Sequence, residues 1–391
     1  MRVLFVHEVS FLDKPIFEMH EFPEYLASRG HEVHFVDFLE NGHLFSKIGI
    51  STRAITGRTS SVGLTLHSVS APFWGIVKRV LAALGAPGFL GRTINQVAPD
   101  VIVTYAVPTF GWQTVRLARR RGIPVVYRAL DVSHRLRKTL FSKLVRRAES
   151  YVCKNATHIS ANNSALESYC LRLAGGTLSS SVDLPPLDLE LFHPTASSSS
   201  KAGEPEARAT VIFLGTFFPF SGLDVFIESM SRLDDINFKL VLIGGGELDQ
   251  KLRSLTAELQ LEEFVEFLGF VEYSSLIKHL QSADIAINPM VPSLVAHKAL
   301  PNKILQYMGS GLPVVSTRLE GLQSVIQDSA GLFLVSNPGQ LAAEVSDLVR
   351  NLDKLATLGL EARKSVEGLF GNHSPEEEFQ QLLLNLADVA T

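Results

Sequence analysis

The chain has 391 residues, 46% of them apolar, and a formal net charge of −4. That length is enough for two or three domains of ordinary size. No apolar stretch approaches the ~20 residues that a membrane-spanning helix needs, and the apolar run after Met1 is too short for a signal peptide. The two cysteines, Cys153 and Cys170, fit no metal-binding spacing. We therefore expect a protein of the reducing cytoplasm.

The charge is distributed unevenly between the two halves of the chain. Residues 1–200 carry 22 Lys and Arg against 15 Asp and Glu, a balance of +7. Residues 201–391 carry 14 against 25, a balance of −11. The first half is therefore expected to meet an anionic partner, whereas acidic residues in the second half are accounted for by solvated surface.

The first half alternates short apolar runs with helical patterns, which is typical of a parallel sheet covered on both faces. The first strand, helix and strand form a right-handed βαβ unit. Its first loop, residues 7–14, contains no glycine, so the dinucleotide pattern G-x-G-x-x-G is absent. Expected strands are 3–6, 32–38, 100–105, 123–130 and 157–162; expected helices are 15–29, 110–122, 139–155 and one that runs through 173.

Residues 41–99 contain no acidic residue. Within them, 72–90 combines an apolar face with Trp74 and the pair Lys78-Arg79, and the pattern is interrupted at Gly85 and Pro87. This composition suits an amphipathic helix in an anionic membrane interface. The alternative is an ordinary core helix with two exposed cations.

A serine-rich segment at 196–208 has the composition of a linker, and the strand–helix alternation restarts after it. The expected domains are 1–195, 209–370 and a final segment, 371–391. Expected strands are 209–215, 238–246, 264–271, 283–290, 313–316 and 331–335; expected helices are 222–233, one from 247, 302–309, 338–367 and 374–389.

Ligands of doubly wound sheets bind beyond the carboxyl ends of the strands. In the first half, Asp131 and His134 follow such an end, where a carboxylate can orient an imidazole that acts as a base. The alternative is that Asp131 caps a helix and His134 is exposed. Arg128, on the same strand, is expected to pair with Asp131 or to bind an anion.

In the second half, Gly244, Gly245 and Gly246 permit close approach to a ligand or form a plain tight turn. The stretch NKILQYMGSGLPVVST (302–317) predicts a short helix, a Gly-Ser-Gly turn and a buried strand. A helix N-terminus after an irregular loop attracts anions, and Lys303 adds a charge there. The alternative is one more sheet-covering helix with a surface lysine.

Five motifs occur in one order: VIFLG…SGLDVFIESM, KLVLIGGGELDQKLRSL, VEFLGFV, ADIAINPM and LPNKILQYMGSGLPVVST. Together with ASRGHEVHFVDF, GIPVVYRALDVSH and VDLPPLDLELFHP in the first half, they resemble family 4 of the GT-B glycosyltransferases over nearly the whole chain. The resemblance implies an α/β fold of two Rossmann-like doubly wound domains facing across a cleft. It also implies a C-terminal helix that crosses back to the first domain.

The resemblance further implies retaining transfer of a sugar from a nucleotide-diphosphate sugar, with the nucleotide in the second domain and the acceptor in the first. His134, oriented by Asp131, is the implied catalytic group near the transferred sugar. The implied substrate-binding residues are Gly215, Thr216, Ser221, Gly244, Gly245, Gly246, Phe270, Val271, His297, Lys298, Asn302, Lys303, Ile304 and Gln306.

Four positions depart from the family's pattern. Thr216 and Ser221 stand where the family has a diphosphate-clamping Arg and Lys, and Lys298 and Gln306 stand where it has two glutamates. The Gln306 amide can still bind ribose hydroxyls. His297, Lys298 and Lys303 are expected to restore positive charge near the diphosphate, because the departing group must be stabilised.

We therefore expect a glycosyltransferase without cofactor or metal that uses a nucleotide sugar and a glycan or lipid-linked acceptor. It would act in the cytoplasm, at the inner face of the membrane, with an anionic membrane surface and no nucleic acid as partner. The alternatives are a catalytically inactive GT-B scaffold subunit, favoured by the four departures, and a GT-B sugar-nucleotide epimerase.

Overall fold

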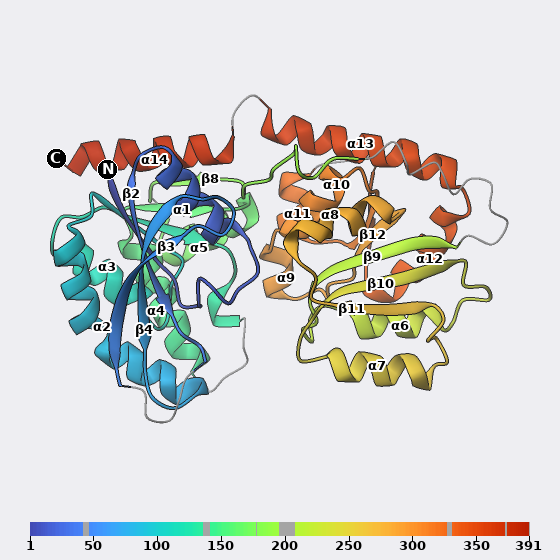
Figure 1. The fold of residues 1–391 in the computed structure, drawn as a ribbon, viewed down its shortest axis with the longest axis horizontal. Coiled ribbons are helices and arrows are strands. Elements are labelled where there is room, and N and C mark those ends of the chain that lie inside the picture. Colours follow the sequence, from blue (N-terminus) through green and yellow to red (C-terminus); the bar gives the residue numbers. More distant parts are fainter. Residues whose placement is uncertain are drawn as a thin grey trace. The chain divides into compact units, whose positions relative to one another are not determined.

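The computed structural model describes residues 1–41, 47–135, 141–176, 178–194, 208–326, 331–371 and 374–390. It divides into two compact units (Figure 1): unit 1 comprises Met1–Pro186 and His373–Thr391, and unit 2 comprises Leu187–Asn372. The first domain was predicted to end at residue 195, but the first part of unit 1 ends at Pro186, because residues 187–194 pack on unit 2. The Arg363 guanidinium donates hydrogen bonds to the carbonyls of Leu189 and Phe192. Residues 196–207 of the predicted linker lie outside the described residues.

In its described part, unit 1 has one sheet in the order β3-β4-β2-β1-β5-β6-β7-β8. All neighbouring strands are parallel except β3 and β4, which are antiparallel. The strands are β1 (Arg2–Val6), β2 (Glu32–Phe38), β3 (Gly49–Thr56), β4 (Gly63–Ser70), β5 (Val101–Thr104), β6 (Val125–Ala129), β7 (His158–Ala161) and β8 (Ser180–Val182). The sequence pattern did not predict β3 and β4, which lie in the acid-free segment.

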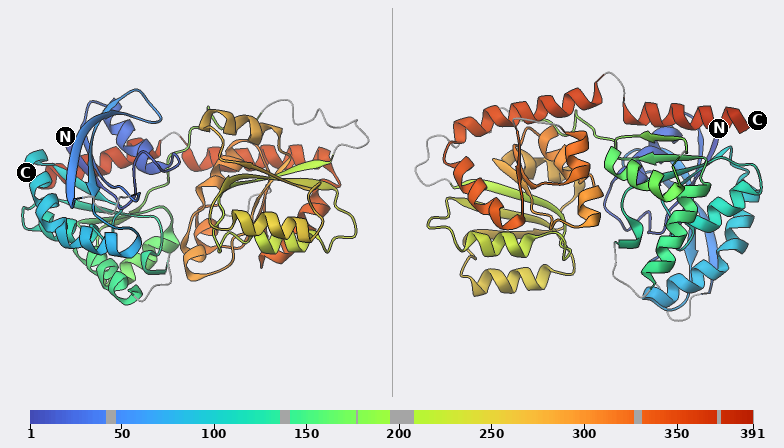
Figure 2. Two further views of the ribbon diagram at one scale, coloured as in Figure 1. Left: turned by 60° about the horizontal axis from the view of Figure 1, so that its bottom comes forward. Right: turned by 180° about the vertical axis from the view of Figure 1, so that it is seen from behind.

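Helices cover this sheet on both faces (Figure 2). They are α1 (Glu18–Ser28), α2 (Gly75–Val97), α3 (Gly111–Arg119), the 3₁₀ turn η1 (Ser133–Arg135), α4 (Ser142–Asn155), α5 (Ser164–Ala174) and α14 (Pro375–Ala390). None of the described helices is long and apolar enough to cross a bilayer.

The predicted interruption of the second helix at Gly85 and Pro87 is wrong, because α2 continues through both. Proline removes the N–H that would bond the carbonyl four residues earlier, which here belongs to Ala83. The side-chain amide of Gln113, on α3, donates to that carbonyl at 3.1 Å. A neighbouring helix thus replaces the lost hydrogen bond.

Helix α14 returns to unit 1, as the family resemblance implied. Phe379 packs against Phe22 of α1 with ring centroids 4.4 Å apart, and Phe379 and Leu383 are both fully buried in the core that underlies β1, β2 and β5. Arg29 and Glu377 form an exposed ion pair at 3.1 Å.

Unit 2 has a parallel sheet in the order β11-β10-β9-β12-β13-β14 within its described residues. The strands are β9 (Ala209–Thr216), β10 (Phe238–Gly245), β11 (Val265–Gly269), β12 (Ile285–Asn288), β13 (Val314–Thr317) and β14 (Leu332–Val335). The helices are α6 (Leu223–Met230), α7 (Asp249–Glu258), α8 (Tyr273–Ser282), α9 (Leu294–Lys298), α10 (Asn302–Gly309), α11 (Glu320–Val325), the turn η3 (Pro338–Gln340), α12 (Leu341–Val349) and α13 (Leu352–Phe370).

The helix predicted over 338–367 is divided in the structure. Helix α12 ends at Val349, and Asn351 caps the start of α13, where its side-chain oxygen accepts a hydrogen bond from the Lys354 N–H at 3.1 Å. Asparagine is common at such N-cap positions because its side-chain oxygen accepts a hydrogen bond from a free helix N–H.

Candidate functional site

In unit 2, helix α10 is held against strand β9 by one buried hydrogen bond. The Tyr307 hydroxyl accepts from the Leu214 N–H at 2.6 Å. Lys303 lies one helical turn earlier on the same face, and its Nζ lies 3.8 Å from the centroid of the Phe213 ring. A β-carbon added to Gly215 would lie 3.7 Å from that Nζ. The lysine therefore reaches the carboxyl end of β9.

The Lys303 ammonium has no hydrogen-bond or ion-pair partner in the described part of the chain. Burial lowers its pKa to about 7, because removal from water disfavours the charged form. A cation in this position is stabilised by an incoming anion, so it is suited to a phosphate group.

Three glycines lie beside this lysine, at the carboxyl ends of β9 and β10. Gly215 and Gly244 are paired across β9 and β10 and have φ values of +130° and +127°. A β-carbon at Gly244 would come within 2.0 Å of the Gly215 carbonyl oxygen. One at Gly246 would lie 2.9 Å from backbone atoms of Phe217. Side chains therefore do not fit at Gly244 and Gly246, whereas Gly215 and Gly246 are exposed and leave their backbone open to a ligand at this edge.

The loop after β9 bridges two neighbouring strand ends. The Phe217 N–H donates to the Gly245 carbonyl at 2.9 Å, and the Val291 N–H donates to the Phe220 carbonyl at 2.9 Å. Ser221 is buried in this loop, and its hydroxyl has no hydrogen-bond partner among the described residues. A polar atom buried in this way is available to a ligand.

Aromatic side chains flank the same edge. Phe270 is 75% exposed, and its ring lies 2.9 Å from a β-carbon position at Gly245. Phe218 is also exposed and stacks on Phe220 with centroids 5.3 Å apart. Exposed rings beside a backbone edge provide stacking faces for a planar base. Val271, the next predicted residue, is half-buried.

Lys298 and His297, two of the residues that were expected to add positive charge, have different surroundings. Lys298 forms an ion pair with Glu320, at the start of α11, so its charge is already balanced. The Nδ1 atom of His297 is buried without a hydrogen-bond partner among the described residues, so this nitrogen is available to a ligand.

The remaining predicted residues of α10 have different environments. Asn302 and Gln306 are half-buried, and the Gln306 side-chain amide forms no hydrogen bond with the described residues. Ile304 is fully buried, and its N–H donates to the Pro301 carbonyl at 2.9 Å. Ile304 is thus a core residue that offers no free group to a ligand. Thr216 is exposed at the tip of β9.

In unit 1, the sequence had predicted that His134 pairs with Asp131. The structure pairs it with Glu149 instead. His134 Nδ1 lies 2.7 Å from a Glu149 carboxylate oxygen, and the Tyr169 hydroxyl donates to the same oxygen at 3.0 Å. Glu149 is fully buried and also accepts from the Ser133 N–H at 2.9 Å. These contacts fix the His134 ring.

Asp131 has neither of its predicted roles. It forms no hydrogen bond with a described residue and does not cap a helix. Burial, together with the charge of Glu18, raises its pKa to about 7. Its carboxyl group therefore exchanges a proton near neutral pH, as a general acid or base must.

The structure gives Arg128 a third role that the sequence pattern did not predict. Its guanidinium forms a bidentate pair with Glu18 at 2.7 and 2.8 Å and donates to the Asp183 carbonyl at 2.7 Å. Both side chains are fully buried, so Arg128 is structural. His7 stacks on Tyr105, and burial lowers the pKa of His7 to about 3, which leaves a neutral ring.

The prediction from sequence missed Glu149, Tyr169, Phe218 and Glu320. Glu149 had a signal, because it lies in phase with buried Val152 and Cys153 on α4. A carboxylate on the apolar face of a helix needs a buried partner. Glu320 had no local signal, since its contact with Lys298 joins two helices.

Two family models match the chain. The glycosyl transferase 4-like domain matches residues 19–177, and the glycosyl transferases group 1 model matches residues 208–351. Among curated proteins, the amylovoran biosynthesis glycosyltransferase AmsK of Erwinia amylovora is 29% identical over 174 residues, 42% of each chain. The lipopolysaccharide core biosynthesis glycosyltransferase LpsE of Rhizobium meliloti is 26% identical over 190 residues, 48% of this chain and 53% of that one. The chain thus spans about half the length of these relatives.

Solved structures share the fold over the full length. Sucrose-phosphate synthase from Thermosynechococcus elongatus superposes with a TM-score of 0.80 at 16% identity, covering 99% of both chains. HepE of Anabaena, in complex with UDP, gives 0.72 at 17% identity, covering 99% of this chain and 100% of that one. The fold is that of a two-domain GT-B protein. With both family models matched in order, the chain belongs to the group 1, or family 4, glycosyltransferases.

Proposed function

We propose that this protein transfers a sugar from a nucleotide-diphosphate sugar to a glycan or lipid-linked acceptor, with retention of configuration. Membership of the family supports the transfer. The HepE structures with UDP and with UDP-glucose support a uridine nucleotide as a first donor candidate. The names of AmsK and LpsE support an acceptor in a cell-surface polysaccharide.

The observation that carries the proposal is the unpaired Lys303 ammonium at the end of β9. A nucleoside diphosphate bound there would place its phosphates at Lys303 and the exposed backbone of Gly215. Its base would meet Phe270, and its ribose would meet the Gln306 amide. As the bond between the sugar and the diphosphate breaks, the ammonium would stabilise the charge on the departing group.

His134 is the proposed catalytic group for the sugar. Retaining transfer passes through a cationic sugar, which a polar side chain fixed beside it can stabilise. The buried Glu149 carboxylate orients the ring. Asp131, with its pKa near 7, is available for proton exchange with an acceptor hydroxyl.

A donor screen tests the proposal. Purified protein is incubated with nucleotide sugars, beginning with UDP-glucose, and release of nucleoside diphosphate is measured for the wild type and for Lys303→Ala. We expect release by the wild type with at least one donor and a marked loss in the variant. Binding of nucleoside diphosphate without turnover of any donor, with or without acceptor extracts, would contradict the proposed transfer.

The second candidate is a catalytically inactive GT-B protein that serves as a scaffold subunit. The ion pair between Lys298 and Glu320 favours it, because it leaves Lys303 with less help from neighbouring cations than expected. A scaffold protein would bind nucleotide without releasing product. The epimerase alternative has less support, since the order of motifs follows the transferases.

The proposed membrane association rests on the apolar side chains of the predicted segment 72–90 and not on its pair of cations. Lys78 is buried and donates to the carbonyls of Glu40 and Asn41, and Arg79 pairs with Glu40 at 3.1 Å. These cations are therefore not free to meet lipid. The start of α2 nevertheless exposes apolar side chains: Trp74, Ile76, Val77, Val80 and Leu84. Such a stripe supports insertion into a membrane interface.

A further inference from the structure

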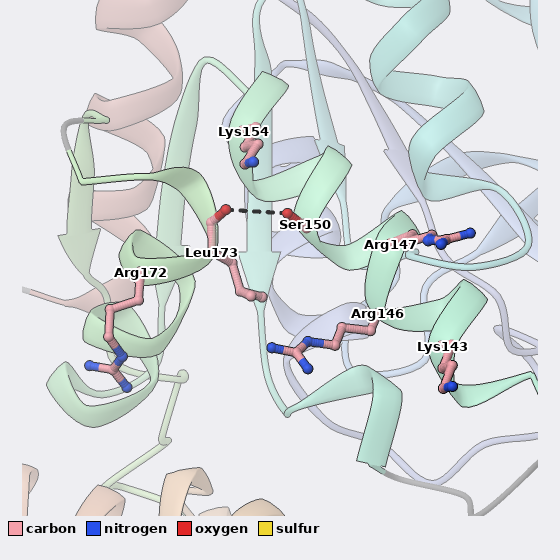
Figure 3. A pocket seen from close by; sticks show the side chains of 7 residues that line it. All are labelled: Lys143, Arg146, Arg147, Ser150, Lys154, Arg172 and Leu173. Carbon is pink, nitrogen blue, oxygen red and sulfur yellow. Dashed lines mark hydrogen bonds between the residues drawn. The ribbon is translucent and has the colours of Figure 1, made fainter.

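A hollow of about 540 Å³ lies between helices α4 and α5 of unit 1 (Figure 3). Ser150 and Leu173 contribute to its lining, and the Ser150 hydroxyl donates to the Leu173 carbonyl at 3.3 Å. Five cations complete the lining: Lys143, Arg146, Arg147, Lys154 and Arg172. The hollow contains no residue of the predicted nucleotide or catalytic sites.

None of these five cations forms a hydrogen bond or ion pair with a residue in the described ranges. Three other surface cations of unit 1 do have partners: Arg2 pairs with Asp100, Lys14 with Glu40 and Arg29 with Glu377. The charges around the hollow are thus left without local compensation.

The cluster is not needed to hold α4 in place. The buried side of this helix carries Glu149, Val152 and Cys153, whereas Lys143, Arg146 and Arg147 are exposed. Like charges on adjacent helical turns repel one another. The arrangement weakens the isolated helix, and an anion in the hollow would reduce the repulsion.

We propose that this hollow binds a phosphate group. Arginine presents a planar fork of donors that matches phosphate oxygens, and three of the five cations are arginines. The hollow has room for a phosphorylated molecule and not only for a single ion. The phosphate is carried either by a soluble compound or by a lipid headgroup, which share the same chemistry.

The test uses Arg146→Gln/Arg147→Gln and, at the other end of the hollow, Lys154→Gln/Arg172→Gln. Arg92→Gln/Arg116→Gln is the matched control, because it removes two exposed, unpaired cations of α2 and α3 outside the hollow. All proteins carry Lys303→Ala, which removes the donor-site lysine. Melting temperatures establish that each variant is folded.

Calorimetry with inorganic pyrophosphate measures the soluble source. Flotation with phosphatidylcholine vesicles, with and without phosphatidylglycerol, measures the lipid source. We expect at least one readout to fall by about tenfold or more in both hollow variants and to stay unchanged in the control. Loss of pyrophosphate affinity identifies a soluble phosphate ligand, and loss of flotation alone identifies a headgroup. If neither readout distinguishes the hollow variants from the control, the proposal is overturned, whatever the donor screen shows.

Discussion

Nδ1 of His134 lies 2.7 Å from a carboxylate oxygen of Glu149, a side chain with no exposed surface. This contact joins the proposed chemistry to the stability of unit 1. An exposed histidine could be replaced with little change in stability. The buried pairing predicts otherwise, because removing one partner leaves a buried carboxylate with fewer hydrogen bonds.

His134→Ala is expected to lower turnover by about 10²-fold or more, the lower range for a positioned catalytic group. It should also lower the free energy of unfolding by about 1–3 kcal/mol. Turnover with the identified donor and urea unfolding measure the two effects. Tyr169→Phe is the control, since it removes a hydrogen bond from Glu149 but leaves the imidazole. Full activity of His134→Ala would end the catalytic assignment.

Asp131→Asn is expected to stabilise the protein above neutral pH. The pKa of Asp131 is about 7 in the folded chain and about 3.9 in an unfolded one. Between these values the folded state holds more protons than the unfolded state, so the stability that Asp131 contributes falls as pH rises. Asparagine removes this loss. We expect a gain of about 1–3 kcal/mol near pH 8 and none near pH 4, measured by urea unfolding. Parallel pH profiles for the variant and the wild type would contradict the raised pKa.

Lys303→Ala is expected to weaken binding of UDP by roughly 1–3 kcal/mol, the scale of a charge-assisted hydrogen bond. Calorimetry measures the affinity directly. Lys239→Ala is the matched control, because Lys239 already pairs with Glu266 on the surface of the same unit. Equal affinities for the two variants would show that the diphosphate lies elsewhere.

The same lysine predicts a pH dependence of nucleotide binding. Because burial lowers the pKa of Lys303 to about 7, its ammonium loses its proton as pH rises from 7 to 9. UDP affinity should therefore decrease over this range, approaching about tenfold per pH unit. Lys303→Arg should remove the dependence, because a guanidinium stays charged. An unchanged slope in the arginine variant would assign the titration to another group.

The apolar start of α2 predicts that membrane binding depends on its exposed apolar side chains and not on the charges of Lys78 and Arg79. The double variant Trp74→Ser/Leu84→Ser removes exposed apolar surface from α2, since the two side chains are 66% and 75% exposed. Flotation with phosphatidylglycerol vesicles should fall by about tenfold or more, while melting changes little. Ser substitutions of two exposed leucines outside this stripe, Leu12 and Leu360, provide the control. Equal flotation of all three proteins would refute insertion by α2.

Much of the fold could be predicted from local patterns. The helix at Asn302–Gly309 has the predicted bounds, because Pro301 and Gly311 punctuate it and its apolar residues recur at helical spacing. The hairpin β3–β4 was missed because its strands carry few long apolar runs. The continuity of α2 could not be foreseen, since the compensating Gln113 comes from another helix.

The candidate sites were predicted less completely than the fold. Lys303 and the glycine edge follow from helix and strand ends, which are visible in the sequence. The partners of His134, Arg128 and Lys298 do not, because each contact joins elements that are distant along the chain. Glu18, for example, pairs with Arg128 across 110 positions. Residue types therefore indicated where charges would be, but not which of them would neutralise one another.

The return of α14 to unit 1 has a consequence for synthesis. Domains fold as units and generally from the N-terminus as the chain emerges from the ribosome. Unit 1 cannot do so, because Phe379 and Leu383 complete its core only after the whole of unit 2 has been translated. Until then Phe22 and its neighbours present an uncovered apolar face. A nascent chain of this protein should therefore keep a chaperone bound at unit 1 for longer than at unit 2, and a circular permutant that places α14 before β1 should shorten that exposure.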